Sequence, residues 1–253
     1  MPVRRLRLTL EYDGTAYHGF QRQNGQRTVQ DALERAIGGV TREECRVVAA
    51  GRTDAGVHAV GQVVHLDTKT GLDTETFRRA VNAVLAEDIA VRDVADVEAD
   101  FHARYWARRR EYHYRILNTP VRSPLARRTS AHIAKRLDET AMGAAGNLLV
   151  GDHDFASFGG KMWSGGTTCR TVHRLTVVRQ GDWVTVEIVA NAYLSRMVRA
   201  IVGCLIAVGQ GDLDVAGVES ILLARDRGQA RWLAPAQGLC LMRVDYADTQ
   251  LFS

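Results

Sequence analysis

The stretch GRTDAGVHAVGQVVHL, residues 51–66, contains a carboxylate that could do chemistry. Asp54 follows Arg52 by two residues and lies between Gly51 and Gly56, which let the backbone turn sharply and approach a ligand closely. The side chains of Thr53 and Asp54 can hydrogen-bond nearby backbone amides and hold such a loop. A carboxylate paired with a guanidinium has a lowered pKa and stays ionised, which suits a nucleophile or a charge stabiliser better than a general acid. The stretch also fits an ordinary turn that contains an aspartate.

A second candidate segment is RRREYHYRI, residues 108–116. Alternate side chains of a strand share one face, and one face here carries Arg108, Arg110, Tyr112 and Tyr114. Basic groups beside flat aromatic rings form a surface on which bases stack while phosphates are neutralised. The same pattern fits a strand whose tyrosines lie in the core and whose arginines are solvated. Composition alone does not decide between the two.

The segment YLSRMVRAIVG, residues 193–203, has the period of an amphipathic helix. Its apolar stripe consists of Leu194, Met197, Val198 and Ile201. Arg196 and Arg199 lie three residues apart on another face, and Gly203, one turn further, leaves room for tight packing. The two arginines fit either the solvated face of the helix or a cationic site.

A fourth segment, DHDFASF at residues 152–158, has two acids, a histidine and two phenylalanines, which could suggest a metal site. No other cluster of histidine and aspartate has convincing ligand spacing. The sequence therefore favours a capped turn with buried rings, and no metal site is predicted.

Composition places the chain among globular proteins. It has 253 residues, of which 46% are hydrophobic and 25% are charged, enough for one large or two small domains. The net charge is +4, and lysine occurs only at Lys69, Lys135 and Lys161, so 30 of the 33 basic residues are arginine. This bias fits a GC-rich genome, but arginine also grips phosphates bidentately and stacks on bases.

The four cysteines are far apart, without a CxxC motif or a Cys/His pair at metal spacing: Cys45, Cys169, Cys204 and Cys240. They could form two disulfides, but reduced, buried thiols in a cytosolic protein are favoured. The N-terminal residues lack the apolar core of a signal peptide. The apolar stretch near residues 198–208 is too short to span a bilayer. We therefore expect a soluble cytoplasmic protein without a membrane partner.

Hydrophobic periodicity and turn signals predict the elements that position these segments. In the first half they are a strand (5–12), a helix (29–37, capped by Thr28), two strands (46–50 and 57–66), a helix (74–85) and a strand (89–94). The strand 57–66 is apolar on both faces and is expected to be central. In the second half they are a strand (109–117), a helix (138–149), a hairpin (172–179 with 183–190), two helices (194–208 and 215–223) and a strand (239–246). Gly181-Asp182 is a good tight-turn pair for that hairpin.

Both halves follow the order β-α-β-β-α-β, although their sequences do not match. We therefore expect an α+β fold of two ferredoxin-like lobes, with mixed, largely antiparallel sheets, helices on the outside and a central cleft, to which the family resemblance given below assigns RNA binding. The N-terminal lobe, residues 1–105, would carry the GRTDAG loop, and the C-terminal lobe, residues 106–253, would complete the cleft. The join near residues 101–106 has no Pro/Gly/Ser-rich linker, which indicates closely packed lobes.

Taken together, these segments resemble the tRNA pseudouridine synthase A (TruA) family. The resemblance runs from end to end in the family's order, and GRTDAG followed by VHA and a GQV strand is its most specific element. The other matching segments are EYDGTAYHGFQRQ (11–23), TVQDALERA (28–36), FHAR (101–104), EYHYRI (111–116), HDFASF (153–158), CRTV (169–172), MVRAIVG (197–203) and GLCLMRVDY (238–246). The chain departs from the family at Phe20, where many members have tryptophan, and at Ala236-Gln237, which interrupts a proline pair.

The resemblance implies an isomerase that converts uridine to pseudouridine in the anticodon stem-loop of tRNA, at positions 38, 39 and 40, without a metal or organic cofactor. It implies that Asp54 is the catalytic residue and that Arg199 pairs with it. It implies that Tyr112 lies against the target base and that Arg52 contacts RNA and helps to displace the target nucleotide. A homodimer with each tRNA held across both subunits is also implied. Further candidates for RNA contact are Arg108, Arg110 and Arg196.

Two alternatives stand beside this interpretation. A non-catalytic tRNA-binding protein or chaperone would use the arginine and tyrosine surfaces but would not need Asp54. A hydrolase with Asp54 as nucleophile is disfavoured because no partner acid, base or metal set accompanies it. The sequence does not decide whether Asp54 attacks the base or the sugar, nor whether Tyr112 accepts a proton or only stacks.

Overall fold

The computed structural model describes residues 2–160 and 166–246 of the chain. They form two compact units: the first contains the residues up to Arg108 and those from Leu241 onward, and the second is Arg109–Cys240. Most of the last strand therefore belongs to the first unit. The expected lobes instead divide the chain at a single point, between residues 105 and 106, and assign that strand to the second lobe. That division into lobes stays a prediction. Among the described residues, no helix combines the length and the apolar character needed to cross a membrane.

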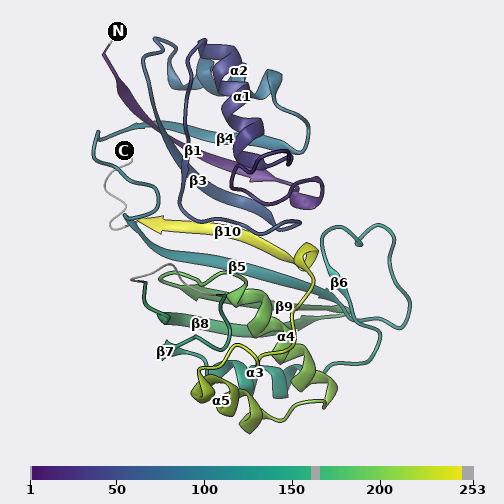
Figure 1. The fold of residues 1–253 in the computed structure, drawn as a ribbon. Coiled ribbons are helices and arrows are strands. Elements are labelled where there is room, and N and C mark those ends of the chain that lie inside the picture. The colour runs from purple at the N-terminus through teal and green to yellow at the C-terminus, as the bar shows by residue number, and fades with distance from the viewer. Residues whose placement is uncertain (1, 161–165, 247–253) are drawn as a thin grey trace. The chain divides into compact units, whose positions relative to one another are not determined.

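The first unit is built on a sheet with the strand order β4-β1-β3-β10. Its strands are β1 (Arg4–Tyr12), β3 (His58–Thr68), β4 (Ile89–Val97) and β10 (Leu239–Tyr246), and β2 (Val48–Ala49) pairs with β3. The helices α1 (Val29–Thr41) and α2 (Thr74–Val84) lie together on one face of β1 and β4, and a short 3-10 turn, η1 (Gly14–Ala16), follows β1 (Figure 1). The order from β1 to β4 is the predicted one, but β2 has two residues instead of five.

The alternation of β1 places its leucines in the core. Leu6, Leu8 and Leu10 are fully buried, and β1 pairs antiparallel with both β3 and β4. On the opposite face, Arg5 forms an ion pair with Asp67 of β3 at 2.7 Å. The strand confirms the prediction, and a period of two explains why the three leucines share its buried face.

Helix α1 begins where its capping residue predicts. The hydroxyl of Thr28 accepts a hydrogen bond from the backbone N–H of Asp31 at 3.4 Å. The helix buries an apolar stripe that consists of Val29, Leu33, Ala36 and Ile37. The cap satisfies one of the unpaired N–H groups of the first turn, and the stripe holds the helix on its sheet.

The second unit has the strand order β5-β9-β8-β7, with antiparallel pairing throughout this series. Its strands are β5 (Ala107–Leu117), β7 (Gly151–Asp154), β8 (Cys169–Gln180) and β9 (Trp183–Ala190), and β6 (Ala131–His132) pairs parallel with β5. Its helices are α3 (Glu139–Asn147), α4 (Met197–Gln210) and α5 (Val215–Ala224), followed by the 3-10 turn η2 (Ala236–Gly238). The predicted hairpin is confirmed, and Gly181 in its turn has a φ of 60°. The α+β class with mostly antiparallel pairing is therefore confirmed.

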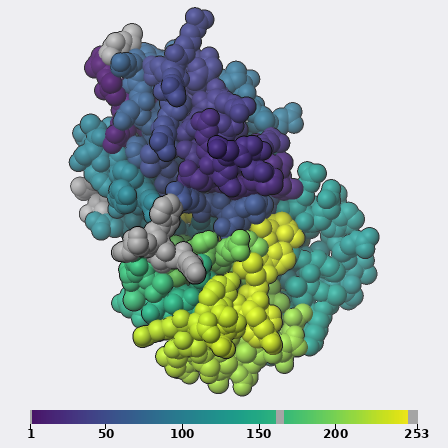
Figure 2. Space-filling view, in the orientation of Figure 1, coloured from purple at the N-terminus to yellow at the C-terminus, as the bar shows by residue number. Residues whose placement is uncertain are grey.

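The segment between β5 and β6 runs over the surface of the second unit and is drawn in teal in Figures 1 and 2. Val121 and Leu125 in this segment are 77% and 96% exposed. The hydroxyl of Ser130 donates to the carbonyl of Ala126 at 2.9 Å, which closes a turn at the end of the segment.

All four cysteines are free thiols, as the sequence favours. Only Cys204 is buried, and burial raises its pKa to about 12. Cys45 and Cys240 are half-buried and Cys169 is exposed, so the expectation of buried thiols is correct for Cys204 alone. The reason is position: Cys204 lies on the core face of α4, whereas Cys169 begins β8 at its solvated end.

Candidate functional site

The GRTDAG loop connects β2 to β3, which is an interior strand of the first unit's sheet. The backbone N–H of Val57 donates to the carbonyl of Asp54 at 3.1 Å and closes a turn, in which Gly56 has a φ of 78°. Thr53 is buried, Asp54 is half-buried and Arg52 is exposed. The loop therefore exposes Arg52, half-buries Asp54 and places Thr53 in the core.

The hydroxyl of Thr53 anchors the loop to β1. It lies 2.8 Å from the hydroxyl of Tyr12, and the two residues are only 6% and 3% exposed. The carbonyl of Thr53 accepts a hydrogen bond from the backbone N–H of Phe20 at 3.0 Å. The prediction that the Thr53 side chain holds neighbouring backbone amides is thus wrong, because the end of β1 brings a tyrosine hydroxyl beside it.

A buried amide on β3 provides a second anchor. The Nε2 of Gln62 donates to the carbonyl of Gly51 at 2.8 Å and lies 3.5 Å from the hydroxyl of Tyr12. Gln62 is fully buried, where a polar group is stable only if it is hydrogen-bonded. The anchors at Gly51 and Thr53 therefore lie on either side of Arg52.

The segment that follows β1 packs directly against the backbone of the loop. Gly19 has a φ of 88°, and a Cβ atom there would lie 2.8 Å from the carbonyl oxygen of Thr53 and 3.2 Å from the nitrogen of Ala55. Only glycine avoids both the conformational strain and the collision. The N–H of Gly56 also donates to the carbonyl of Tyr17 at 3.3 Å. Residues 12–20 thus form the support of the loop.

Sequence reasoning did not assign this supporting role to Tyr12, Gly19 or Gln62. A signal for Gln62 was present, because this glutamine lies between the apolar Val60 and Val64 on one face of β3. Tyr12 looked like the last core residue of a strand, and its hydroxyl gave no indication of a partner.

In the second unit, Arg110 and Tyr112 lie on one face of β5, as the alternation predicts. The ring of Tyr112 contacts that of Tyr193 edge-on, with centroids 5.2 Å apart and planes at 90°. The Tyr193 hydroxyl lies 3.0 Å from the carbonyls of both Arg110 and Ile188, and burial raises the pKa of Tyr193 well above its ordinary value. Tyr193 is therefore a neutral donor that fixes the angle at which Tyr112 is held.

The sequence allowed two interpretations of the RRREYHYRI strand, a basic and aromatic surface or a strand with core tyrosines and solvated arginines. Each is correct for part of the strand. Tyr114 is a core residue: it is fully buried, burial raises its pKa, and its hydroxyl donates to the carbonyl of Pro235 at 2.9 Å. Arg108 is exposed. Arg110 is largely buried, and its Nη1 donates to the carbonyl of Asn191 at 2.5 Å. A basic surface is thus present only at the start of the strand.

Helix α4 begins at Met197, three residues later than predicted, because Arg196 has a φ of 63°. That conformation lies outside the right-handed helical region. The predicted apolar stripe is buried, and Arg196 is exposed. Arg199 is half-buried, and its Nε donates to the carbonyl of Ala234 at 2.9 Å. The Ala234 N–H in turn donates to the carbonyl of Arg199 at 3.0 Å, so the start of α4 is joined to residues 232–234.

The space that the sequence predicts beside Gly203 is filled by backbone. A Cβ atom at Gly203 would lie 2.7 Å from the carbonyl carbon of Trp232 and 3.0 Å from the nitrogen of Leu233. The absence of a side chain lets this segment approach α4 closely enough to form both hydrogen bonds between Ala234 and Arg199.

The DHDFASF segment is a capped turn, as predicted. The Oδ1 of Asp154 accepts a hydrogen bond from the N–H of Ala156 at 3.1 Å, and Phe155 and Phe158 are fully buried. The segment therefore contributes to the core of the second unit.

Among the described residues, one cluster has acceptor atoms close enough to hold a cation: those of Glu111, His113 and Glu187 lie within 4.8 Å of one another. Arg174 forms ion pairs with Glu111 at 3.2 Å and with Glu187 at 3.1 Å. This guanidinium already supplies the positive charge that the two carboxylates require.

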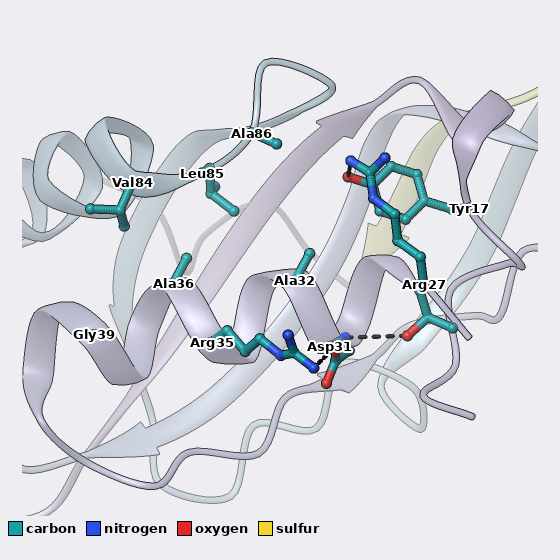
Figure 3. A pocket seen from close by; sticks show the side chains of 11 residues that line it. Tyr17, Arg27, Asp31, Ala32, Arg35, Ala36, Gly39, Val84, Leu85 and Ala86 are labelled. Atoms are coloured by element: carbon teal, nitrogen blue, oxygen red, sulfur yellow. Dashed lines mark hydrogen bonds and ion pairs between the residues drawn. The ribbon is translucent and has the colours of Figure 1, made fainter. Parts of the chain in front are cut away.

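A pocket of about 440 Å³ lies beside α1, between Tyr17 and the end of α2 (Figure 3). Its charged side chains are paired within the protein: Arg27 with Asp88 at 2.8 Å and Arg35 with Asp31 at 2.9 Å. Because these charges are already balanced and no predicted site residue lines the pocket, we do not assign the chemistry to it.

The predicted site residues come from both units. Asp54, Arg52 and Arg108 belong to the first unit, and the second contains Tyr112, Arg110, Arg196 and Arg199. The structure brings Arg110 and Tyr112 together around Tyr193, and it fixes the GRTDAG loop by its anchors. That the side chain of Asp54 lies close to those of Tyr112 and Arg199 stays a prediction.

Comparison with known proteins now defines the class. The family model described as tRNA pseudouridine synthase matches residues 9–106 and 145–247. Among solved structures, a chain in the crystal structure of the archaeal box H/ACA sRNP Nop10-Cbf5 complex aligns with 79% of this chain and 43% of its own length. Its identity is 12% and its TM-score 0.31, too distant a likeness to carry a conclusion.

Curated relatives are much closer in sequence. The tRNA pseudouridine synthase A of Methylobacterium nodulans is 46% identical, and the match covers 98% of both chains. That of Nitrosococcus oceani is 45% identical over 96% of this chain and 94% of the relative, and that of Acetivibrio thermocellus is 40% identical over 96% and 100%. The chain therefore belongs to the tRNA pseudouridine synthase A family.

Proposed function

We propose that this protein converts uridine to pseudouridine in the anticodon stem-loop of tRNA, at positions 38, 39 and 40, with Asp54 as the catalytic carboxylate. As a member of the tRNA pseudouridine synthase A family, the chain is a tRNA-modifying isomerase. Family membership alone does not give the modified positions in tRNA or the roles of single residues, and these are part of the proposal. One observation supports the choice of Asp54. This residue is half-buried on a loop in which the preceding Gly51 and Thr53 are fixed by buried hydrogen bonds.

The reaction rearranges one nucleotide. The bond between N1 of uracil and C1′ of ribose breaks, the base turns, and C5 forms a bond to C1′. C5 loses its proton and N1 gains one, so nothing is oxidised and no group is imported. An ionised carboxylate beside the sugar–base bond can start this reaction by adding to the base or by acting at the sugar. The proposal assigns that group to Asp54 and is compatible with both routes.

Arg199 is proposed as the partner that keeps Asp54 ionised and oriented, because a neighbouring guanidinium favours the charged form of a carboxylate. The family resemblance supports this pairing. The Nε of Arg199 donates to the carbonyl of Ala234 at 2.9 Å, and this bond restricts the orientation of the Arg199 side chain. Tyr112 is proposed to lie against the target base, and its edge-on contact with Tyr193 supports a fixed orientation of the ring.

The target base must leave its stack, at a cost of a few kcal/mol. Arg52 is proposed to offset this cost by contacting RNA and occupying the space that the nucleotide leaves. It is exposed, and within the described part of the chain it makes no hydrogen bond or ion pair. Arg108 and Arg196 are exposed and suit phosphate contacts, whereas Arg110 could reach RNA only through the small exposed part of its side chain.

The proposal includes a cytoplasmic homodimer with each tRNA held across both subunits, and it requires no metal or organic cofactor. These statements rest on the family resemblance. We retain two ferredoxin-like lobes, residues 1–105 and 106–253, as the proposed architecture. The β-α-β-β-α-β order from β1 to β4 supports this for the first lobe.

Tritium release tests the proposed function directly. A tRNA transcript labelled at C5 of uridine is incubated with the wild type, with Asp54→Asn and with the control Asp96→Asn. Asp96 is a carboxylate of β4 with 55% of its side chain exposed. We expect the wild type and the control to release tritium, and Asp54→Asn to bind the tRNA without releasing it.

Loss of tRNA binding in parallel with activity would contradict the role given to Asp54. If the wild type bound tRNA and released no tritium, the non-catalytic RNA-binding alternative would replace the enzyme. Mapping the modified nucleotides of the product then tests positions 38, 39 and 40.

A further inference from the structure

Three buried polar side chains of the first unit form a continuous chain of hydrogen bonds beneath the GRTDAG loop. Tyr12 ends β1, Gln62 lies within β3, and Thr53 belongs to the loop itself. Their exposed fractions are 3%, 0% and 6%. We call these three residues the loop clamp.

The loop clamp holds two points of the loop that are one residue apart. The Gln62 amide donates to the carbonyl of Gly51 at 2.8 Å, and the Tyr12 hydroxyl meets that of Thr53 at 2.8 Å. The 3.5 Å contact between Gln62 and Tyr12 joins the two attachments. Arg52 lies between these points, and Asp54 follows the second directly.

The requirements of the core do not explain the polar groups of the loop clamp. Gln62 interrupts a strand whose next residues, Val63 and Val64, are buried and apolar. Burying hydroxyls and amides costs desolvation free energy, and replacing both members of a hydrogen-bonded pair by apolar groups of the same shape can be nearly neutral. A satisfied buried polar network does add one property that an apolar core lacks, which is a unique geometry.

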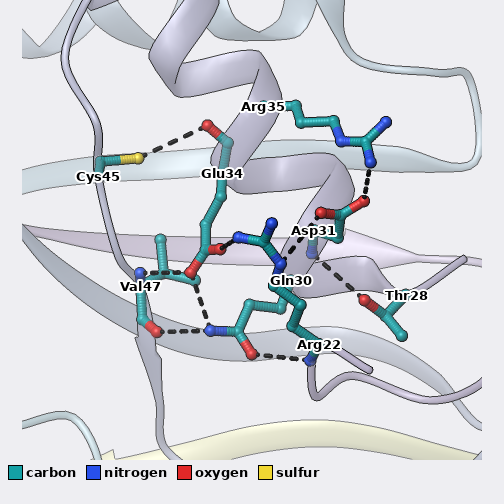
Figure 4. A network of polar contacts seen from close by, with 8 residues as sticks. All are labelled: Arg22, Thr28, Gln30, Asp31, Glu34, Arg35, Cys45 and Val47. Carbon is teal, nitrogen blue, oxygen red and sulfur yellow. Dashed lines mark hydrogen bonds and ion pairs between the residues drawn. The ribbon is translucent and has the colours of Figure 1, made fainter. Parts of the chain in front are cut away.

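The same loop is also held from its other side. The N–H of Phe20 donates to the carbonyl of Thr53, and the N–H of Gln30 in α1 donates to the carbonyl of Phe20, each at 3.0 Å. Figure 4 shows the side chain of Gln30 bound on to Glu34 at 2.8 Å and to the carbonyl of Val47 at 3.2 Å. The loop is therefore fixed between β1, β3 and α1, and little of its backbone can adapt.

We propose that Tyr12, Thr53 and Gln62 are positioning residues for the isomerisation. They keep the backbone of residues 51–54 in the shape that presents Asp54 to the nucleotide, and they contact neither the tRNA nor the reacting atoms. This inference rests on the proposed function of Asp54. A catalytic group misplaced by about 1 Å can lose on the order of a hundredfold in rate, so small relaxations of the loop have large kinetic effects.

The test compares single-turnover tritium release at saturating tRNA for the wild type, Tyr12→Phe, Thr53→Val and Thr53→Ser. Tyr12→Phe and Thr53→Val remove one hydroxyl and keep the shape of the side chain, whereas Thr53→Ser keeps the hydroxyl. Tyr17→Phe is the matched control, because it leaves the backbone bond from Gly56 to Tyr17 intact and removes a hydroxyl whose partners in the described part of the chain are Asp88 and Arg27, outside the loop. Filter binding gives the Kd for tRNA, and thermal unfolding gives Tm.

We expect the release rate to fall about 10- to 100-fold in Tyr12→Phe and Thr53→Val, with Kd within about twofold of the wild type. Thr53→Ser should stay within about threefold of the wild-type rate. Tyr17→Phe should lower Tm about as much as Tyr12→Phe without lowering the rate. This combination separates positioning from a general loss of stability.

Wild-type rates in both Tyr12→Phe and Thr53→Val would overturn the positioning role, as would losses of rate that are fully matched by losses of tRNA binding. If Tyr12→Phe does not fold, the comparison of Thr53→Val with Thr53→Ser decides the question. A wild-type protein that releases no tritium would remove the proposed function itself, which distinguishes that failure from failure of the inference.

Discussion

The close packing of α4 against residues 232–234 makes Gly203→Ala an informative substitution. The added Cβ would lie 2.7 Å from the carbonyl carbon and 2.8 Å from the carbonyl oxygen of Trp232, and 3.0 Å from the nitrogen of Leu233. All three are backbone atoms, so the helix or the segment must move. That movement also pulls on the two hydrogen bonds between Ala234 and Arg199.

The expected cost follows from these contacts. Overpacking of a well-packed site costs about 1–3 kcal/mol. Each weakened hydrogen bond between Ala234 and Arg199 adds about 0.5–1.5 kcal/mol. Replacing a helical glycine by alanine returns roughly 0.5–1 kcal/mol. We therefore expect the free energy of unfolding to fall by about 3 kcal/mol, and tritium release to fall as well because Arg199 moves.

Urea unfolding followed by far-UV circular dichroism measures this change. The matched control is Gly39→Ala in α1, where nothing lies within 4 Å of the added Cβ, and where we expect a gain of about 0.5–1 kcal/mol. A Gly203→Ala protein as stable as Gly39→Ala, with wild-type tritium release, would refute the argument from close packing.

Two further predictions concern single side chains. Tyr112→Phe keeps the ring that packs on Tyr193 and should retain tritium release within about tenfold, whereas loss of 10²–10⁴-fold with intact tRNA binding would instead indicate proton transfer by the hydroxyl. His65 is buried, its Nδ1 accepts a hydrogen bond from the N–H of Ala103 at 3.1 Å, and burial with the nearby His102 and Arg5 lowers its pKa to about 4. Since the unfolded chain binds the proton at a higher pH than the folded one, the free energy of unfolding should fall by about 2 kcal/mol between pH ~6.5 and ~4. In His65→Asn, the free energy of unfolding, measured by urea denaturation, should change less with pH across this range. If it changes as much as in the wild type, groups other than His65 cause the pH dependence.

Patterns of short range determined much of the fold. The buried leucines of β1 and the Thr28 cap of α1 follow from periods and spacings that span only a few residues. The hairpin of β8 and β9 follows from Gly181 in the same way. Elements of two to four residues, such as β2, β6 and β7, are too short to show a period and depend on neighbouring strands. The late start of α4 reflects the backbone conformation of Arg196, to which a hydrophobic pattern is insensitive.

For the site, the sequence by itself determined the carboxylate, its glycine-flanked loop and the family to which the chain belongs. Only the tertiary structure decided what holds that loop, because the hydrogen bonds of the loop clamp join Tyr12 to Thr53, Gln62 to Gly51 and Gln62 to Tyr12, which are 41, 11 and 50 residues apart. Their contact depends on the pairing of β1 with β3, in which a shift of register between Leu10 and Tyr12 occurs close to Gln62. No local pattern specifies that shift, because the register of two strands is set by their packing in the sheet.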